Sequence, residues 1–164
     1  MNNQLNEFEV IQNAAIGAHV FYEFIKRYEN SNKDKLGPLL PFMFPVLPIV
    51  FTKEYAEQIA NRNFKIGSFY KVITLDNSFF INIVPKMQEL SETTYKALGL
   101  SFSSKILTYD KENSRIYTGR RVNILKSSEL SKPYQNIIKS SQRLGSWFAQ
   151  LKDDEIISYF NLNF

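Results

Sequence analysis

The residues able to do acid–base, nucleophilic or metal chemistry are few in this chain and are not grouped. His19 is the only histidine, and it lies in an apolar segment where a hydrogen-bonded, structural imidazole is favoured over a general base. The chain has no cysteine, which excludes disulfides, thiolate metal sites and cysteine nucleophiles. No two acidic residues stand at a recognisable metal-ligand spacing with His19. We therefore expect no metal, no other cofactor and no enzymatic activity.

The acidic run and the glycines also lack a catalytic pattern. Asp153, Asp154 and Glu155 stand where a helix is expected to begin, and capping together with the helix dipole explains carboxylates at that place. Neither a Gly-x-x-x-x-Gly-Lys loop nor a Gly-x-Gly-x-x-Gly turn occurs among the six glycines. Nucleotide hydrolysis by this chain alone is not expected.

An apolar stretch from Leu36 to Phe51 is interrupted by four prolines. Each proline removes a backbone donor and fixes φ, so an ordinary helix or a central strand is disfavoured here. Such apolar side chains must be covered, either by the core of the chain itself or by a partner protein. The second alternative predicts partner contacts from this stretch and from two adjacent aromatic residues further along: Pro41, Phe42, Phe44, Pro45, Leu47, Phe51, Trp147 and Phe148.

Positive charge is concentrated in the second half of the chain. The net charge is +4, yet residues 105–143 hold nine basic and three acidic residues. A field of this sign can steer a phosphate backbone or an acidic protein face, and a solvated helix face explains it as well. If the chain touches DNA, we expect phosphate contacts without sequence readout, from Lys111, Arg115, Arg120 and Arg121.

Apolar periodicity predicts a mainly α protein with one β-hairpin (α+β), folded as a single domain over residues 1–164. The expected helices cover residues 13–30; 53–60, capped by Thr52; 69–75, capped by Ser68; a longer stretch from Asn77 or Ser78 to near Gly99, interrupted or kinked at Pro85; 133–151, with Pro133 in the first turn; and 154–160. β-rich runs at 105–109 and 115–119 flank a polar turn and predict the hairpin. A helix followed by a basic hairpin is also compatible with a winged-helix-like arrangement.

Two features bear on localisation. The start of the chain lacks the basic and apolar regions of a signal peptide. No uncharged apolar stretch reaches the roughly 20 residues needed to cross a bilayer. We expect a cytoplasmic protein without membrane contact.

Three segments occur in the order and spacing of a known family. They are Asn13-Ala-Ala-Ile-Gly-Ala-His, the proline-rich run 39–51 with Val46-Leu-Pro-Ile-Val, and Arg143-Leu-Gly-Ser-Trp-Phe-Ala. Together they resemble the middle component of bacterial three-component ABC-ATPase systems, over nearly the whole chain. The resemblance implies a non-catalytic accessory subunit that works with an SMC-like or Rad50-like ABC ATPase and a separate effector, often a nuclease. It also implies a role in defence against phages or plasmids, of which Lamassu-type systems are an example.

Two functions of different classes remain open. In the first, the chain is an adaptor that docks on an SMC-like ATPase through apolar surface and helps to couple sensing of DNA or DNA ends to the effector. In the alternative, it is a stand-alone winged-helix-like regulator that binds DNA through the basic hairpin. Salt-dependent DNA binding by the isolated chain, lost when Arg120 and Arg121 are replaced, would favour the regulator.

Overall fold

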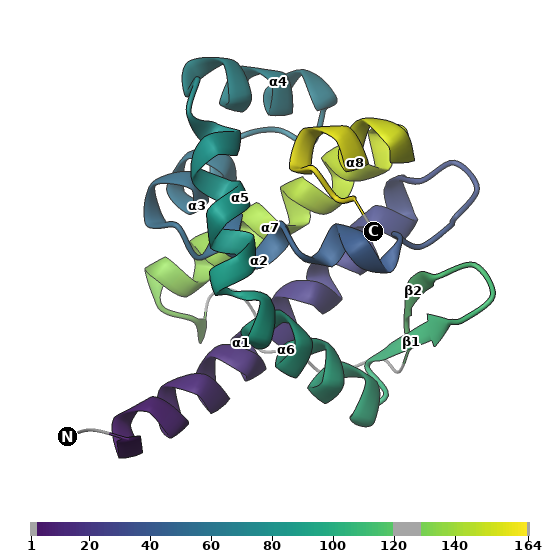
Figure 1. Cartoon of the computed structure of the whole chain (residues 1–164). Helices are drawn as coiled ribbons and strands as arrows, with labels where there is room; N and C mark the ends of the chain where they lie inside the picture. Colours follow the sequence, from purple (N-terminus) through teal and green to yellow (C-terminus); the bar gives the residue numbers. More distant parts are fainter. Residues whose placement is uncertain (1–2, 120–128, 164) are drawn as a thin grey trace.

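The computed structural model describes residues 3–119 and 129–163, and within them it shows eight α-helices, one 3₁₀ turn and one two-stranded antiparallel sheet (Figure 1). This confirms the predicted class, mainly α with a β-hairpin. The elements in chain order are α1 (Asn3–Ser31), η1 (Leu40–Met43), α2 (Val46–Val50), α3 (Lys53–Ala60), α4 (Ile66–Leu75), α5 (Phe79–Glu89), α6 (Ser91–Ser103), β1 (Leu107–Asp110), β2 (Arg115–Thr118), α7 (Lys132–Gln150) and α8 (Asp153–Phe160). No helix in these ranges is long and apolar enough to cross a membrane.

Helix α1 is the centre of the core, and α7 and α6 pack against it (Figure 1). Two glycines allow these helices to come close. A Cβ atom on Gly17 would lie 2.8 Å from the Cβ of Ala97 on α6, and one on Gly145 of α7 would lie 2.3 Å from the carbonyl oxygen of Phe24 on α1. Since real Cβ atoms do not approach other atoms so closely, both crossings depend on the absence of a side chain.

The proline-rich run is covered by the chain's own core. It forms η1 and the short α2 rather than an extended segment, and Leu39 bridges to Arg115 of the hairpin. The Leu40 amide donates to the Ser114 carbonyl at 2.9 Å. Phe42, Val46 and the rest of α2 are buried, and α2 packs against α7. Burial within the chain is thus the alternative that the structure favours for this run.

Several helices have the expected bounds. α3 covers Lys53–Ala60, and α7 begins with Pro133 in its first turn. Thr52 has the extended backbone of an N-cap, but its hydroxyl donates to the Pro48 carbonyl at 2.8 Å instead of capping α3.

Other helix ends differ from the sequence-based expectation. α1 begins at Asn3 rather than after Asn13, and α4 begins at Ile66, which places Ser68 inside the helix. Pro85 lies within α5 and does not end it; the chain turns instead at Leu90, which closes α5 and opens α6.

The hairpin has the predicted position and is fastened to α1. β1 and β2 pair from Leu107 opposite Thr118 to Asp110 opposite Arg115. The Glu29 carboxylate of α1 accepts hydrogen bonds from the Thr118 amide at 2.8 Å and from its hydroxyl at 2.7 Å. The hairpin therefore packs as part of the domain.

Candidate interaction surfaces

Most of the residues predicted to bind a partner lie inside the core. Five of the eight are buried: Phe42, Pro45, Leu47, Trp147 and Phe148. Direct contact between these side chains and another protein would require the domain to open. The other three, Pro41, Phe44 and Phe51, are half-buried.

Phe44 belongs to an aromatic strip that we define as Phe44, Tyr95, Phe102 and Tyr109, in which the two tyrosines are exposed and the two phenylalanines are half-buried. The Phe44 and Tyr95 rings meet edge to face with centroids 5.3 Å apart, and the Phe102 and Tyr109 centroids are 6.1 Å apart. Tyr95 and Phe102 are seven residues apart on α6, which places them two turns apart on one face. Tyr95 is 63% exposed and Tyr109 38% exposed. Aromatic side chains this accessible are typical anchors of protein interfaces.

A gap interrupts the strip at Gly99. Gly99 lies four residues after Tyr95 and three before Phe102, so it shares their face of α6. No atom lies within 4 Å of the position that a Cβ on Gly99 would occupy. Position 99 therefore presents no side chain between Tyr95 and Phe102 on this solvent-facing side of α6.

The predicted nucleic-acid residues of the hairpin have different surroundings. Arg115 is engaged within the chain: one terminal nitrogen donates to the Gly37 carbonyl at 2.7 Å, and the other forms an ion pair with Asp153 at 2.8 Å. Lys111 is exposed in the hairpin turn. Arg120 and Arg121 lie outside the described residues.

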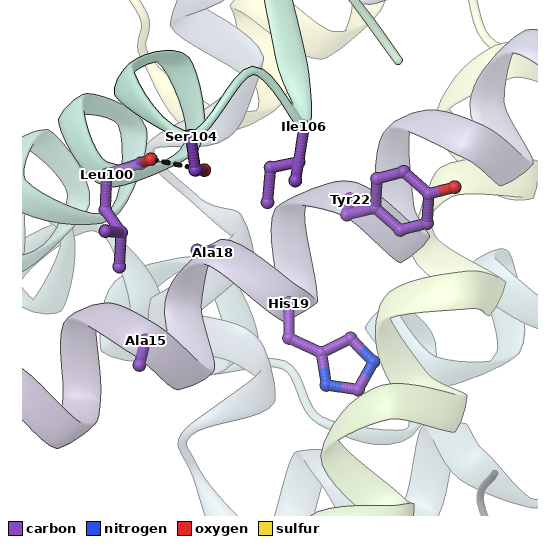
Figure 2. A pocket seen from close by; sticks show the side chains of 7 residues that line it. All are labelled: Ala15, Ala18, His19, Tyr22, Leu100, Ser104 and Ile106. Atoms are coloured by element: carbon purple, nitrogen blue, oxygen red, sulfur yellow. Dashed lines mark hydrogen bonds between the residues drawn. The ribbon is translucent and has the colours of Figure 1, made fainter. Parts of the chain in front are cut away.

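His19 has a structural partner, as its sequence context predicts. Its Nδ1 lies 2.7 Å from the Tyr134 hydroxyl oxygen of α7, and burial lowers the pKa of His19, against the opposing effect of Glu23. His19 borders a shallow hollow of about 270 Å³ between α1 and the end of α6 (Figure 2). The figure shows the imidazole turned toward α7, away from Leu100 and Ser104 across the hollow. The lining of the hollow is mostly apolar: Ala15, Ala18, His19, Tyr22, Leu100, Ser104 and Ile106. The Ser104 hydroxyl donates to the Leu100 carbonyl at 2.6 Å, and the imidazole bonds Tyr134 outside the hollow.

A second, polar hollow of about 370 Å³ lies between α3 and α5. The Asp76 carboxylate accepts hydrogen bonds from Ser78 and, at 2.6 Å, from the Tyr55 hydroxyl, and these bonds lower the pKa of Asp76. Lys86 donates to the Thr52 hydroxyl at 2.9 Å. Because these groups satisfy one another, the arrangement fixes α5 and the α4–α5 turn against α3. The described ranges contain no group of three or more acidic or histidine side chains able to hold a metal ion.

The Gly-Ser-Trp-Phe segment of α7 holds the loop that joins α3 to α4. The Trp147 indole nitrogen donates to the Asn63 carbonyl at 3.0 Å, and the Ser146 hydroxyl donates to the Phe64 carbonyl at 3.1 Å. Gln150 donates to the same Phe64 carbonyl at 2.7 Å. The sequence gives no local signal for this clamp, because its two sides are more than 80 residues apart.

These observations define a helical domain with a docked hairpin, close-packed helix crossings and a partly exposed aromatic strip. The family model of the ABC-three component (ABC-3C) system Middle Component 3 matches residues 1–163. The chain belongs to this family of middle components. Neither a curated protein nor a solved structure was found to match it.

Proposed function

We propose that this chain is a non-catalytic adaptor that docks on the ABC ATPase of its three-component system through the aromatic strip. Membership of the middle-component family supports the assignment to a multi-component ABC system. The observation that carries the docking site is the strip itself, where Tyr95 is 63% exposed, Tyr109 is 38% exposed and Gly99 leaves the space between Tyr95 and Phe102 open. Accessible aromatic rings supply many of the contacts that dominate binding energy in protein interfaces.

The wider role follows from the resemblance. The ATPase partner is of the SMC or Rad50 type, the effector subunit is a nuclease, and the complex acts in the cytoplasm against phages or plasmids, as in Lamassu-type systems. In this role the adaptor transmits the state of the ATPase to the effector by contact alone. Pro41 and Phe51, which are half-buried, remain proposed contacts beside Phe44.

The alternative function, a stand-alone winged-helix-like regulator, has weaker support. Arg115 is held by Gly37 and Asp153, so a DNA contact from that guanidinium would cost an internal ion pair. Lys111 is the remaining predicted hairpin contact within the described ranges.

The test is retention of the purified full-length chain on the immobilised ATPase subunit that is encoded with it. Tyr95→Asp places a charge on the strip, and we expect it to weaken binding by about 2 kcal/mol or more, roughly thirtyfold. The matched control is Ile81→Asp, because Ile81 is 73% exposed on α5 and lies outside the strip. Both variants keep the core intact, which circular dichroism checks.

Equal retention of Tyr95→Asp and Ile81→Asp would refute the strip as the docking site. Failure of the unmodified chain to bind the ATPase at all would refute the adaptor role.

A further inference from the structure

Two arginines from distant segments meet on one phenylalanine ring. The guanidinium carbons of Arg27 (α1) and Arg143 (α7) each lie 4.5 Å from the centroid of the Phe64 ring. The two cationic groups are therefore separated by no more than twice that distance. Burial, with the nearby charge of Arg27 as the second cause, lowers the pKa of Arg143. Two like charges within this limit repel each other, and an anion bound by both would relieve that repulsion.

No carboxylate in the described ranges forms an ion pair with either arginine. Arg143 donates to two backbone carbonyls, those of Arg62 at 3.0 Å and Lys139 at 3.2 Å. Glu23 lies one turn before Arg27 on α1, but its carboxylate accepts the Gln142 amide at 2.8 Å. Arg27 thus forms no ion pair within the described residues, and the charged Glu23 carboxylate one turn away is the acidic group of α1 nearest to it in sequence besides Glu29.

The platform beneath the two arginines is rigid. Phe64 lies in the loop that Ser146, Trp147 and Gln150 fasten to α7 through its backbone carbonyls. Stacking on an aromatic ring orients a guanidinium. Arg27 donates no hydrogen bond within the described residues, whereas Arg143 already uses Nε and one terminal nitrogen and keeps its other terminal nitrogen for a ligand. Because the groups are ordered before any ligand arrives, less entropy is lost on binding.

The surrounding segments contribute further cations and few acids. Helix α7 carries Lys132, Lys139 and Arg143 and contains no aspartate or glutamate. The loop over residues 61–65 carries Arg62 and Lys65 and likewise contains no acid. The positive charge of these segments is larger than a single carboxylate would balance. It therefore favours an extended polyanion as the ligand.

We propose that the Arg27–Phe64–Arg143 site binds phosphates of a nucleic-acid backbone. Guanidinium groups match phosphate oxygens in two-point hydrogen bonds, and such contacts bind without reading sequence. The site is distinct from the predicted hairpin residues and does not depend on docking to the ATPase.

The experiment measures fluorescence anisotropy of a labelled duplex of about 20 base pairs with the full-length chain, from about 50 to about 200 mM KCl. Arg27→Gln is the decisive variant, because Arg27 makes no hydrogen bond within the described residues. We expect it to weaken binding about threefold or more and to reduce the slope of log K against log salt by about 0.9. Arg143→Gln should act in the same direction. Lys71→Gln removes the same charge from an exposed position of α4 and should leave the slope almost unchanged.

The remaining outcomes each overturn the proposal. If Arg27→Gln binds like the unmodified chain, or if only Lys111→Gln lowers the slope, the phosphates contact another surface. If polyglutamate at equal charge displaces the duplex as well as unlabelled DNA does, the site fits an acidic protein face. If the chain does not bind the duplex at about 50 mM salt, the site does not bind nucleic acid.

Discussion

Replacing Gly145 by alanine tests whether the Leu-Gly-Ser-Trp-Phe segment is there for the fold. The new Cβ would lie 2.3 Å from the Phe24 carbonyl oxygen, 3.1 Å from the Phe24 carbonyl carbon and 3.2 Å from the Tyr28 nitrogen. All three neighbours are backbone atoms of α1, which no rotamer change can move. Because ordinary contacts are about 3.5 Å, α1 and α7 must separate by about 1 Å.

The cost of that separation can be estimated from the packing it disturbs. Phe24 and Phe148 meet edge to face across the crossing at 5.4 Å, and both are fully buried. Overpacking of this kind lowers the free energy of unfolding by about 3 kcal/mol, the upper end of its usual range. Alanine in place of glycine within a helix raises it by about 1 kcal/mol. The expected net loss for Gly145→Ala is about 2 kcal/mol in the free energy of unfolding.

Urea unfolding followed by far-UV circular dichroism measures this loss, as a midpoint about 1 M lower than that of the unmodified chain. Gly67→Ala is the matched control, because Gly67 lies in α4 with no atom within 4 Å of its Cβ position. It should gain up to about 1 kcal/mol from helix propensity. If Gly145→Ala proves as stable as Gly67→Ala, the close crossing of α1 and α7 is not what the glycine provides.

Three further predictions concern single positions. Gly99→Ala should raise the free energy of unfolding by about 0.5–1 kcal/mol, measured in urea, yet reduce retention on the ATPase because it places a methyl group between Tyr95 and Phe102 on the proposed docking face. Burial, reinforced by Asp153, raises the pKa of Tyr28 to about 12. The stability that the neutral Tyr28 contributes below pH 10 is therefore lost as the pH rises toward 12. Tyr28→Phe should flatten that alkaline decline in the free energy of unfolding, measured as a function of pH. Burial lowers the pKa of His19 below 6.5, so the unfolded chain takes up the proton first and stability falls as the pH drops below that value. His19→Gln should therefore show a smaller difference between urea midpoints at about pH 7.5 and about pH 5.5.

Local signals in the sequence were enough to predict several elements. Thr52 and the apolar period after it marked α3, Pro133 marked the first turn of α7, and the polar turn after Asp110 marked the hairpin. Each signal acts within a few residues, through φ restriction, capping or turn chemistry. It therefore does not depend on how the rest of the chain packs.

The incorrect predictions involve competition between local and tertiary effects. The sequence predicts a long helix interrupted or kinked at Pro85, but Pro85 lies inside α5 and the break between α5 and α6 falls at Leu90. Gly99 was expected near a helix end and instead lies inside α6. Glycine weakens a helix by about 1 kcal/mol, which burial of its neighbours Ala97 and Leu98 outweighs.

Burial of the proline-rich run and of Trp147 could not be deduced from residue types. An apolar aromatic residue is equally suited to a core and to an interface, and only the positions of the other helices distinguish the two. The same holds for the Phe64 site, since Arg27, Phe64 and Arg143 come from three segments without a shared motif.

The three segments that resemble the family serve mainly to hold the fold together. They identify the family without showing where the chain contacts a partner. Gly17 and Gly145 permit the helix crossings, and Trp147 fastens the Phe64 loop. A surface residue such as Tyr95 lies outside all three segments, so a search for contacts among the family motifs would overlook it. Arg143 is different: it opens the third segment, donates to the Arg62 carbonyl and still presents its charge beside Phe64. Because Arg143 supports the loop and also belongs to the proposed phosphate site, Arg143→Lys should keep the charge while weakening the hold on the loop.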